Sequence, residues 1–141
     1  MSVQIARATA ADEDVCREFD PRISEAMIAR KIAAGELLLA RRDSEAVGYL
    51  RLEYLWSKLP FIGLIEVGVA HRNQGVGRAL LKFVEEHVRR SGQRRLLSSS
   101  MVDQMHAQAW HRRMGFAECG FLSGVNTDGI GEVFFVKEVS G

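Results

Sequence analysis

The sharpest change of pattern in the chain lies in the stretch Val67-Gly68-Val69-Ala70-His71-Arg72-Asn73-Gln74-Gly75-Val76-Gly77-Arg78-Ala79-Leu80-Leu81. An apolar strand pattern gives way to a loop with glycines, and an amphipathic helix follows at once. The first turn of a helix leaves N–H groups without intrahelical partners and carries the positive end of the helix dipole. The junction therefore predicts an anion site, for which a phosphate-bearing ligand is the natural occupant.

Basic residues gather around this loop although the whole chain is nearly neutral. Nineteen Lys and Arg face eighteen Asp and Glu, a formal net charge of +1, so no global field argues for nucleic acid or a membrane surface as a partner. Between residues 72 and 95, seven basic residues meet only two acids. Because these charges surround a helix whose apolar face must be buried, they favour a local anion site over a nucleic-acid surface.

The glycines do not match the common phosphate fingerprints. No Lys-Ser/Thr pair follows them, as a Walker loop requires, and Leu80 stands where a GxGxxG motif needs its third glycine. ATPase and dinucleotide-binding functions are therefore disfavoured. A plain tight turn remains the alternative interpretation of the two glycines.

The element pattern predicts one α+β domain over residues 1–141, a length that suits a single core. A central mixed, mostly antiparallel sheet flanked by about four helices is expected. The expected order is a strand at 3–6, helices at 10–19 and 21–35, strands at 36–40, 46–55 and 61–70, a helix from 76, a strand at 96–100, a helix capped by Asp103 and ending near 113, and strands at 116–122 and 131–139.

Cysteine usage and apolar runs favour a soluble, cytoplasmic protein without a metal centre. Cys16 and Cys119 are the only cysteines, lie far apart and form no CxxC motif. The first residues lack the apolar segment of a signal peptide. The longest apolar stretch, at 61–70, has half the length of a membrane span. We therefore expect no membrane partner.

Three motifs resemble one known family. The segment 72–77 is similar to the Arg/Gln-x-x-Gly-x-Gly/Ala pyrophosphate loop of the GNAT superfamily of acyl-CoA-dependent N-acyltransferases. Residues 5–12 resemble that family's first strand and capped first helix, and residues 107–116 resemble its later helix-to-strand signature ending in Gly-Phe. The resemblance covers essentially the whole chain. It implies acetyl-CoA as co-substrate and a primary amine as acceptor.

The resemblance also implies a donor site. The backbone of Val67, Gly68 and Val69 would pair with the pantetheine and the acyl carbonyl, and Gly68 fits a bulge there. The pyrophosphate would sit on the N–H groups of residues 74–78, with charge from Arg72 and Arg78. The cofactor-binding residues carried over are Val67, Gly68, Val69, Arg72, Asn73, Gln74, Gly75, Val76, Gly77, Arg78 and Gln104.

The chain departs from the family pattern near the later helix. Many members have an Asn before this helix and a Tyr within it that protonates the departing thiolate, whereas this chain has Gln104 and His111. A histidine with a pKa near 6.5 can donate a proton at neutral pH, so we expect His111 to replace the Tyr or to hydrogen-bond the sulfur. The alternative is a surface histidine without a catalytic role. The loop before Arg72 is also shorter than usual and lacks the customary Pro.

Glu66 is the leading candidate for the general base that an amine acceptor requires. It is the only charge between Pro60 and His71, and strand alternation places it among apolar residues, where a carboxylate holds a proton more readily. The alternatives are a solvent-facing side chain or a structural pair with an arginine. Glu53 is interpreted as a partner of Arg51, with acceptor binding as its alternative.

These observations predict an N-acetyltransferase in which the amine attacks acetyl-CoA directly in a ternary complex. A non-catalytic acyl-CoA-binding regulatory module is the alternative, favoured by the missing Tyr. The sequence leaves open whether the acceptor is a small-molecule or a peptide amine and whether the protein is a homodimer.

Overall fold

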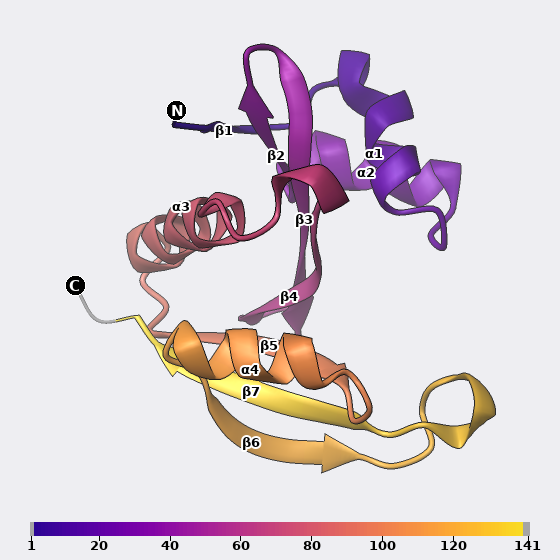
Figure 1. Cartoon of the computed structure of the whole chain (residues 1–141), viewed down its shortest axis with the longest axis vertical. Helices are drawn as coiled ribbons and strands as arrows, with labels where there is room; N and C mark the ends of the chain where they lie inside the picture. The colour runs from indigo at the N-terminus through magenta and orange to yellow at the C-terminus, as the bar shows by residue number, and fades with distance from the viewer. Residues whose placement is uncertain (1, 140–141) are drawn as a thin grey trace. The chain divides into compact units, whose positions relative to one another are not determined.

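In the computed structural model, which describes residues 2–139, the chain forms two compact units. Unit 1 comprises the residues up to Glu53 together with Gly63–Val84, and unit 2 comprises Tyr54–Ile62 and the residues from Glu85 onward. A single domain over residues 1–141 stays a prediction, and residues 1, 140 and 141 of that range lie outside the described part. Figure 1 shows the ribbon of the chain, coloured from the N-terminus to the C-terminus.

The elements confirm the predicted α+β class. In chain order they are β1 (Gln4–Arg7), α1 (Glu13–Phe19), α2 (Glu25–Ala33), β2 (Leu37–Arg42), β3 (Glu45–Leu55), β4 (Leu59–Val67), α3 (Val76–Arg90), β5 (Arg95–Met101), α4 (Met105–Arg113), β6 (Ala117–Leu122) and β7 (Glu132–Glu138), with single 3-10 turns η1 (Ala10–Asp12), η2 (Val69–His71) and η3 (Thr127–Gly129). The strand order is β1-β2-β3-β4-β5-β7-β6. The β4–β5 pair is parallel, whereas β1–β2, β2–β3, β5–β7 and β6–β7 are antiparallel.

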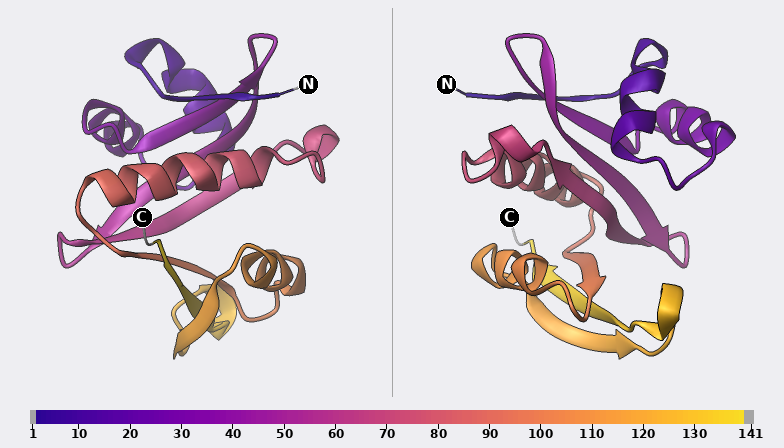
Figure 2. Two further views of the ribbon diagram at one scale, coloured as in Figure 1. Left: turned by 90° about the vertical axis from the view of Figure 1, so that its left-hand side faces the viewer. Right: turned by 45° about the vertical axis from the view of Figure 1, so that its right-hand side comes forward.

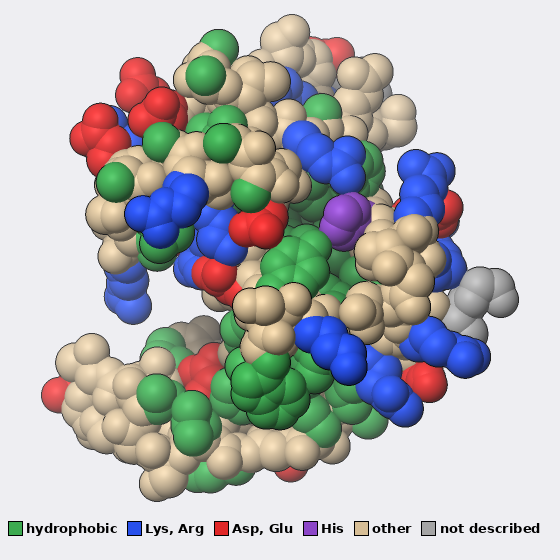
Figure 3. All heavy atoms as spheres, turned by 180° about the vertical axis from the view of Figure 1, so that it is seen from behind, with side chains coloured by type: hydrophobic (Ala, Val, Ile, Leu, Met, Phe, Trp, Pro, Cys, Tyr) green, Lys and Arg blue, Asp and Glu red, His purple; other side chains and the backbone are tan. Residues whose placement is uncertain are grey.

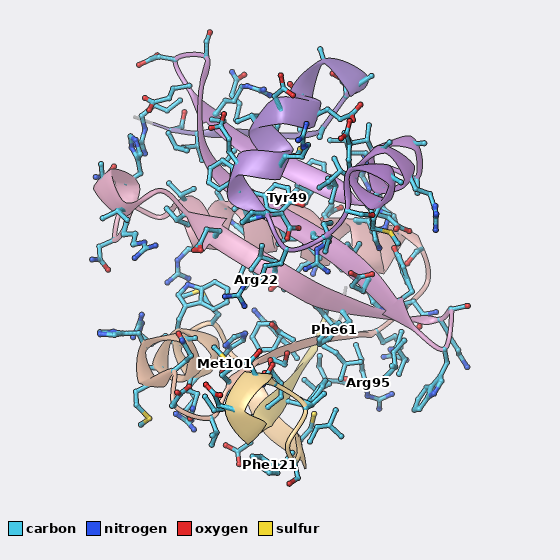
Figure 4. All side chains as sticks on the ribbon, turned by 90° about the vertical axis from the view of Figure 1, so that its right-hand side faces the viewer. Arg22, Tyr49, Phe61, Arg95, Met101 and Phe121 are labelled. Atoms are coloured by element: carbon cyan, nitrogen blue, oxygen red, sulfur yellow. The ribbon has the colours of Figure 1, made fainter. Side chains whose placement is uncertain are left out.

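In unit 1, helices cover both faces of the strands. Helices α1 and α2 lie on one face of β2 and β3, and the first turns of α3 lie on the other (Figure 2). The core under α1 and α2 includes the fully buried Cys16, Ile28, Leu39 and Tyr49. The Tyr49 ring, labelled in Figure 4, stacks on Phe19 at a centroid distance of 5.7 Å.

Side-chain caps explain where the first helices begin. The Thr9 N–H and hydroxyl both donate to the Asp12 carboxylate, at 2.8 and 3.2 Å, as the expected capped start at residue 10 requires. Ser24 Oγ accepts from the Met27 N–H at 3.1 Å, so α2 begins at Glu25, later than the expected start at Pro21.

In unit 2, α4 covers one face of β5 and β7 (Figure 1). Strand β6 ends the strand order, and all six of its residues are exposed. Large apolar side chains also reach the surface of this unit (lower part of Figure 3); they include Leu55, Trp56, Val102, Met105, Phe121, Leu122 and Val125. A homodimer stays a prediction.

Two further expected boundaries are wrong for local reasons. Strand β4 ends at Val67 rather than at Ala70, because the chain turns at Gly68 and the His71 N–H donates to the Gly68 carbonyl at 2.8 Å. The residue before α4 is Gln104 rather than Asp103, because the Gln104 N–H closes a turn onto the Met101 carbonyl at 3.0 Å.

Within residues 2–139, no helix combines the length and the apolar character needed to cross a membrane. The same residues hold no group of three or more His, Cys, Asp and Glu side chains that could bind a metal ion.

Candidate active site

The segment 72–78, called the anion loop below, comprises the connection from η2 to α3 and the first three residues of α3. Asn73 and Gly75 have positive φ values of 61° and 85°, and they turn the chain into the helix. The first hydrogen bond at this helix start runs from the Ala79 N–H to the Gly75 carbonyl at 3.0 Å. The N–H groups of residues 75–78 therefore have no intrahelical acceptor, which is the arrangement that binds an anion.

Gly48 on β3 lets the start of α3 approach the sheet. A Cβ at this position would lie 2.8 Å from Val76 Cγ1 and 3.2 Å from Leu80 Cδ1. Both Val76 and Leu80 are fully buried. Although a glycine inside a strand often marks such a close approach, the sequence interpretation did not single out Gly48.

We expect Gly48→Ala to destabilise the protein by about 1–3 kcal/mol, because the added methyl group overpacks the contact with Val76. The start of α3 would shift, so affinity for a phosphate-bearing ligand should fall as well. Urea unfolding and ligand titration measure the two effects. Gly120→Ala on β6 is the matched control, because a Cβ there meets nothing within 4 Å; equal stability of the two variants would contradict the close approach.

Arg72 folds back onto the end of β4. Its Nε donates to the Val67 carbonyl at 3.0 Å, and its Nη2 lies 3.6 Å from a Glu66 carboxylate oxygen. Arg78 is exposed on the first turn of α3. The two arginines expected to assist a pyrophosphate thus differ in their surroundings. Arg72 contacts the end of β4, whereas Arg78 is exposed.

Some backbone hydrogen-bonding groups at residues 67–69 already have partners within the protein. The Val67 carbonyl accepts from Arg72, and the Gly68 N–H donates to the Val47 carbonyl at 2.9 Å. Val69 is 80% exposed. The Val67 carbonyl oxygen can still accept a second hydrogen bond beside the one from Arg72, and the predicted ligand pairing at these three residues stays a prediction.

The expected apolar setting of Glu66 is wrong. Its side chain is 44% exposed, and Arg72 is its neighbour at 3.6 Å. Strand alternation identified the face on which the side chain lies, but the sequence could not show what covers that face. The carboxylate is open to water and adjoins the residues that lead into the anion loop.

His111 is buried in unit 2 and is not a surface histidine. It is 3% exposed, and its ring stacks on Phe135 at a centroid distance of 4.6 Å. Nδ1 lies 2.7 Å from the Ala107 carbonyl and Nε2 lies 2.7 Å from Ser98 Oγ. Because a carbonyl only accepts, Nδ1 carries the proton and Nε2 of the neutral ring accepts from Ser98.

The burial of His111 predicts a pH dependence of stability. Burial lowers the pKa of His111 below its usual 6.5, although the hydrogen bond to Ala107 acts in the opposite direction. The unfolded chain then binds more protons than the folded protein, so the contribution of His111 is fully present above pH 6.5 and is lost as the pH falls.

Urea unfolding between pH 7.5 and 5 should therefore show a declining free energy of unfolding. The decline should be smaller in His111→Gln, whereas His106→Gln, which alters an exposed histidine of the same helix, should retain the wild-type decline. An identical decline in all three proteins would rule out the contribution of His111.

Gln104 is exposed and precedes α4. Its carbonyl accepts the Gln108 N–H at 3.1 Å, as expected for the residue at a helix start. The structure thus places Gln104 at the expected turn, and its contact with CoA stays a prediction. Gln104 and His111 belong to unit 2, whereas Glu66 and the anion loop belong to unit 1.

A charged network, formed by Asp20, Lys31, Glu36, Arg51 and Glu53, lies within unit 1. Arg51 joins Asp20 at 2.8 Å and also contacts Glu53. Lys31 Nζ lies 2.7 Å from Glu53 and 2.9 Å from Glu36. The expected Arg51–Glu53 pair is therefore present.

The network keeps the Glu53 carboxylate charged. Burial alone would raise the pKa of Glu53, but the hydrogen bonds from Lys31 and Arg51 lower it below the usual 4.5. Because two cations already engage this carboxylate, the geometry favours a structural role for Glu53 over binding of an acceptor amine.

Arg42, at the end of β2, was also not predicted from the sequence as a residue of the site. Its Nη1 donates to Gln74 Oε1 at 2.8 Å and lies 3.2 Å from His71 Nδ1. These contacts join residues 32 and 29 positions apart in the chain. No local pattern carries a signal for such a contact.

The comparisons with known proteins agree on one family. The sequence model of the family described as the acetyltransferase (GNAT) family matches residues 6–116 of this chain. The chain is 36% identical over 84 residues to streptothricin acetyltransferase of Streptomyces lavendulae, covering 57% of this chain and 43% of that protein. It is 38% identical over 95 residues to the type 1 aminoglycoside N(6')-acetyltransferase of Stenotrophomonas maltophilia, covering 61% of this chain and 62% of that protein. The chain thus spans less than two thirds of either relative.

Solved structures share the fold at low sequence identity. Ard1 from Thermoplasma volcanium has a TM-score of 0.89 at 16% identity and full coverage of both chains. A GNAT family acetyltransferase from Elizabethkingia anophelis, solved with acetyl-CoA bound, has a TM-score of 0.80 at 21% identity, covering 97% of this chain and 98% of that chain.

Proposed function

Because the chain belongs to the acetyltransferase (GNAT) family, we propose that it transfers an acetyl group from acetyl-CoA to a primary amine. The observation that carries this proposal is the start of α3, where the N–H groups of residues 75–78 lack intrahelical acceptors. The oxygens of a pyrophosphate are suitable acceptors for these donors, and their negative charge suits the helix dipole. This part of the chain therefore fits CoA.

In the proposed reaction, the amine nitrogen attacks the acetyl carbonyl carbon, the carbon–sulfur bond breaks, and CoA leaves as its thiol. Glu66 takes the proton that the amine loses, directly or through water, because its half-exposed carboxylate lies beside the anion loop. The departing sulfur takes one proton from water, which balances the one that Glu66 takes from the amine. Direct transfer needs no covalent enzyme intermediate.

His111 as donor of the proton to sulfur stays a prediction, and its geometry favours a packing role. Both ring nitrogens have partners, Ser98 and the Ala107 carbonyl, at 2.7 Å. A proton donor would first have to open one of these bonds. This observation also favours the second candidate function, an acyl-CoA-binding module without turnover.

We further propose that the acceptor is a small-molecule amine, with a peptide amine as the alternative. The two curated relatives are named for streptothricin and for aminoglycosides, so these compounds come first in a test. A polyamine, a free amino acid and a short peptide complete the panel.

The test is thiol release from acetyl-CoA in the presence of each amine, together with calorimetric titration of CoA. The enzyme hypothesis expects CoA binding and amine-dependent release of one thiol per acetylated product. Binding without turnover across the panel would favour the regulatory module. Absence of CoA binding would contradict both functions.

A further inference from the structure

We propose that Arg42 is a positioning residue that holds the anion loop in its ligand-binding shape. The inference rests on the proposed function, because the loop is taken to bind the pyrophosphate of CoA. It assigns a role to the β2–β3 hairpin, which neither the motifs nor the family match single out.

The contacts of Arg42 reach the chain on both sides of Arg72. Nη1 donates to the Gln74 side chain at 2.8 Å, and it lies 3.2 Å from His71 Nδ1. Because a guanidinium only donates, His71 Nδ1 accepts this bond and the ring proton sits on Nε2, 3.6 Å from Glu45 on the same hairpin. The hairpin thus contacts the anion loop at Gln74 and the residue directly before the loop, His71.

The loop needs such support. Residues 72–75 are exposed, and Asn73 and Gly75 adopt left-handed conformations. An exposed segment of this kind loses conformational entropy when a ligand orders it. Contacts that fix the loop beforehand reduce this loss and increase affinity.

The charge of Arg42 supports the same role. Within the described part of the chain, Arg42 has no carboxylate within 4.0 Å of its nitrogens, whereas the preceding Arg41 pairs with Asp12 at 2.7 Å. The Arg42 Nε atom is also buried without a hydrogen-bond partner. The guanidinium therefore places an uncompensated positive charge beside a loop that would bind an anion.

Hydrogen exchange tests, without any ligand, whether Arg42 restrains the anion loop. The hydrogen-bonded amides at the two ends of the loop, His71 and Ala79, which donate to the Gly68 and Gly75 carbonyls, should exchange faster in Arg42→Gln than in the wild-type protein, while those of β5 and β7 should be unchanged. The matched control is Arg41→Gln, which removes the neighbouring charge from another partner and should leave the loop unchanged. Equal exchange of the loop in both variants and the wild type would overturn the proposal.

Calorimetric titration with CoA tests whether the contacts of Arg42 increase the affinity for CoA. Loss of a charge-assisted contact should weaken CoA binding by Arg42→Gln about tenfold, with Arg42→Lys intermediate and Arg41→Gln like wild type. At saturating acetyl-CoA the kcat of Arg42→Gln should equal that of the wild type, so that only KM rises.

The outcomes separate this inference from the proposed function. Unchanged CoA affinity in Arg42→Gln would overturn the positioning role and leave the proposed function standing. A wild-type protein that fails to bind CoA would overturn the proposed function, and with it the ligand-binding role of Arg42. A lower kcat at saturating donor would show that Arg42 acts on the chemistry instead.

Discussion

Replacing Asp20 with alanine is expected to lower the free energy of unfolding by about 3–5 kcal/mol. Asp20 is 2% exposed and accepts from Tyr49 Oη at 2.7 Å and from Arg51 Nε at 2.8 Å. Its removal leaves a buried hydroxyl without an acceptor and one face of a largely buried guanidinium unpaired. The cost of such orphaned groups exceeds that of any exposed pair in the chain.

Urea unfolding at neutral pH measures this effect. Asp20→Asn should cost less than the alanine variant, because its amide oxygen still accepts from Tyr49. Asp14→Ala is the control: Asp14 is 95% exposed and pairs with Arg17 at 3.7 Å, so its loss should change stability by less than about 0.5 kcal/mol. Equal effects of Asp20→Ala and Asp14→Ala would show that the charged network does not stabilise unit 1.

Long, strongly periodic elements could be predicted from the sequence. The apolar positions of α3 repeat at helical spacing, and Val76, Leu80, Leu81, Val84 and Val88 are all buried. The loop between β4 and α3 was predicted at the correct place, because a helix start that follows a strand and glycines is a local feature, whereas its binding of an anion stays a prediction. Boundaries governed by turns, such as those at Gly68 and Gln104, were misplaced by one to three residues.

The surroundings of the candidate site residues could not be predicted, because they depend on distant segments. Alternation put Glu66 on one face of β4, yet the charge of Arg72 and the access of water decide its chemistry. His111 was expected to replace the Tyr or to hydrogen-bond the sulfur, with a surface histidine as the alternative, and neither interpretation included its burial, which accompanies stacking on Phe135, 24 positions later. The contacts of Arg42 with His71 and Gln74 likewise arise only when the hairpin folds over the loop.

Glu66→Gln is expected to lower kcat about 100-fold, the lower end of the usual contribution of a general base. The amide has nearly the shape of the carboxylate but cannot take the proton that the amine must lose. Because the side chain is 44% exposed, the substitution should leave the melting temperature and the CoA affinity nearly unchanged. Steady-state kinetics with the best amine of the panel, measured at several pH values, should show that the loss lies in kcat.

Two further variants separate proton transfer from the ion pair with Arg72. Arg72→Gln removes the partner but keeps the carboxylate, so kcat should be largely preserved. Because the substitution also removes a positive charge from the anion loop, we expect a higher KM for acetyl-CoA. Glu118→Gln disrupts another exposed ion pair, with Arg112 at 3.4 Å, and should leave both constants unchanged. If Glu66 only pairs with Arg72, the Glu66→Gln and Arg72→Gln variants will share one kinetic profile, because either substitution breaks the same contact. A loss of kcat confined to Glu66→Gln identifies the carboxylate as the group that accepts the proton.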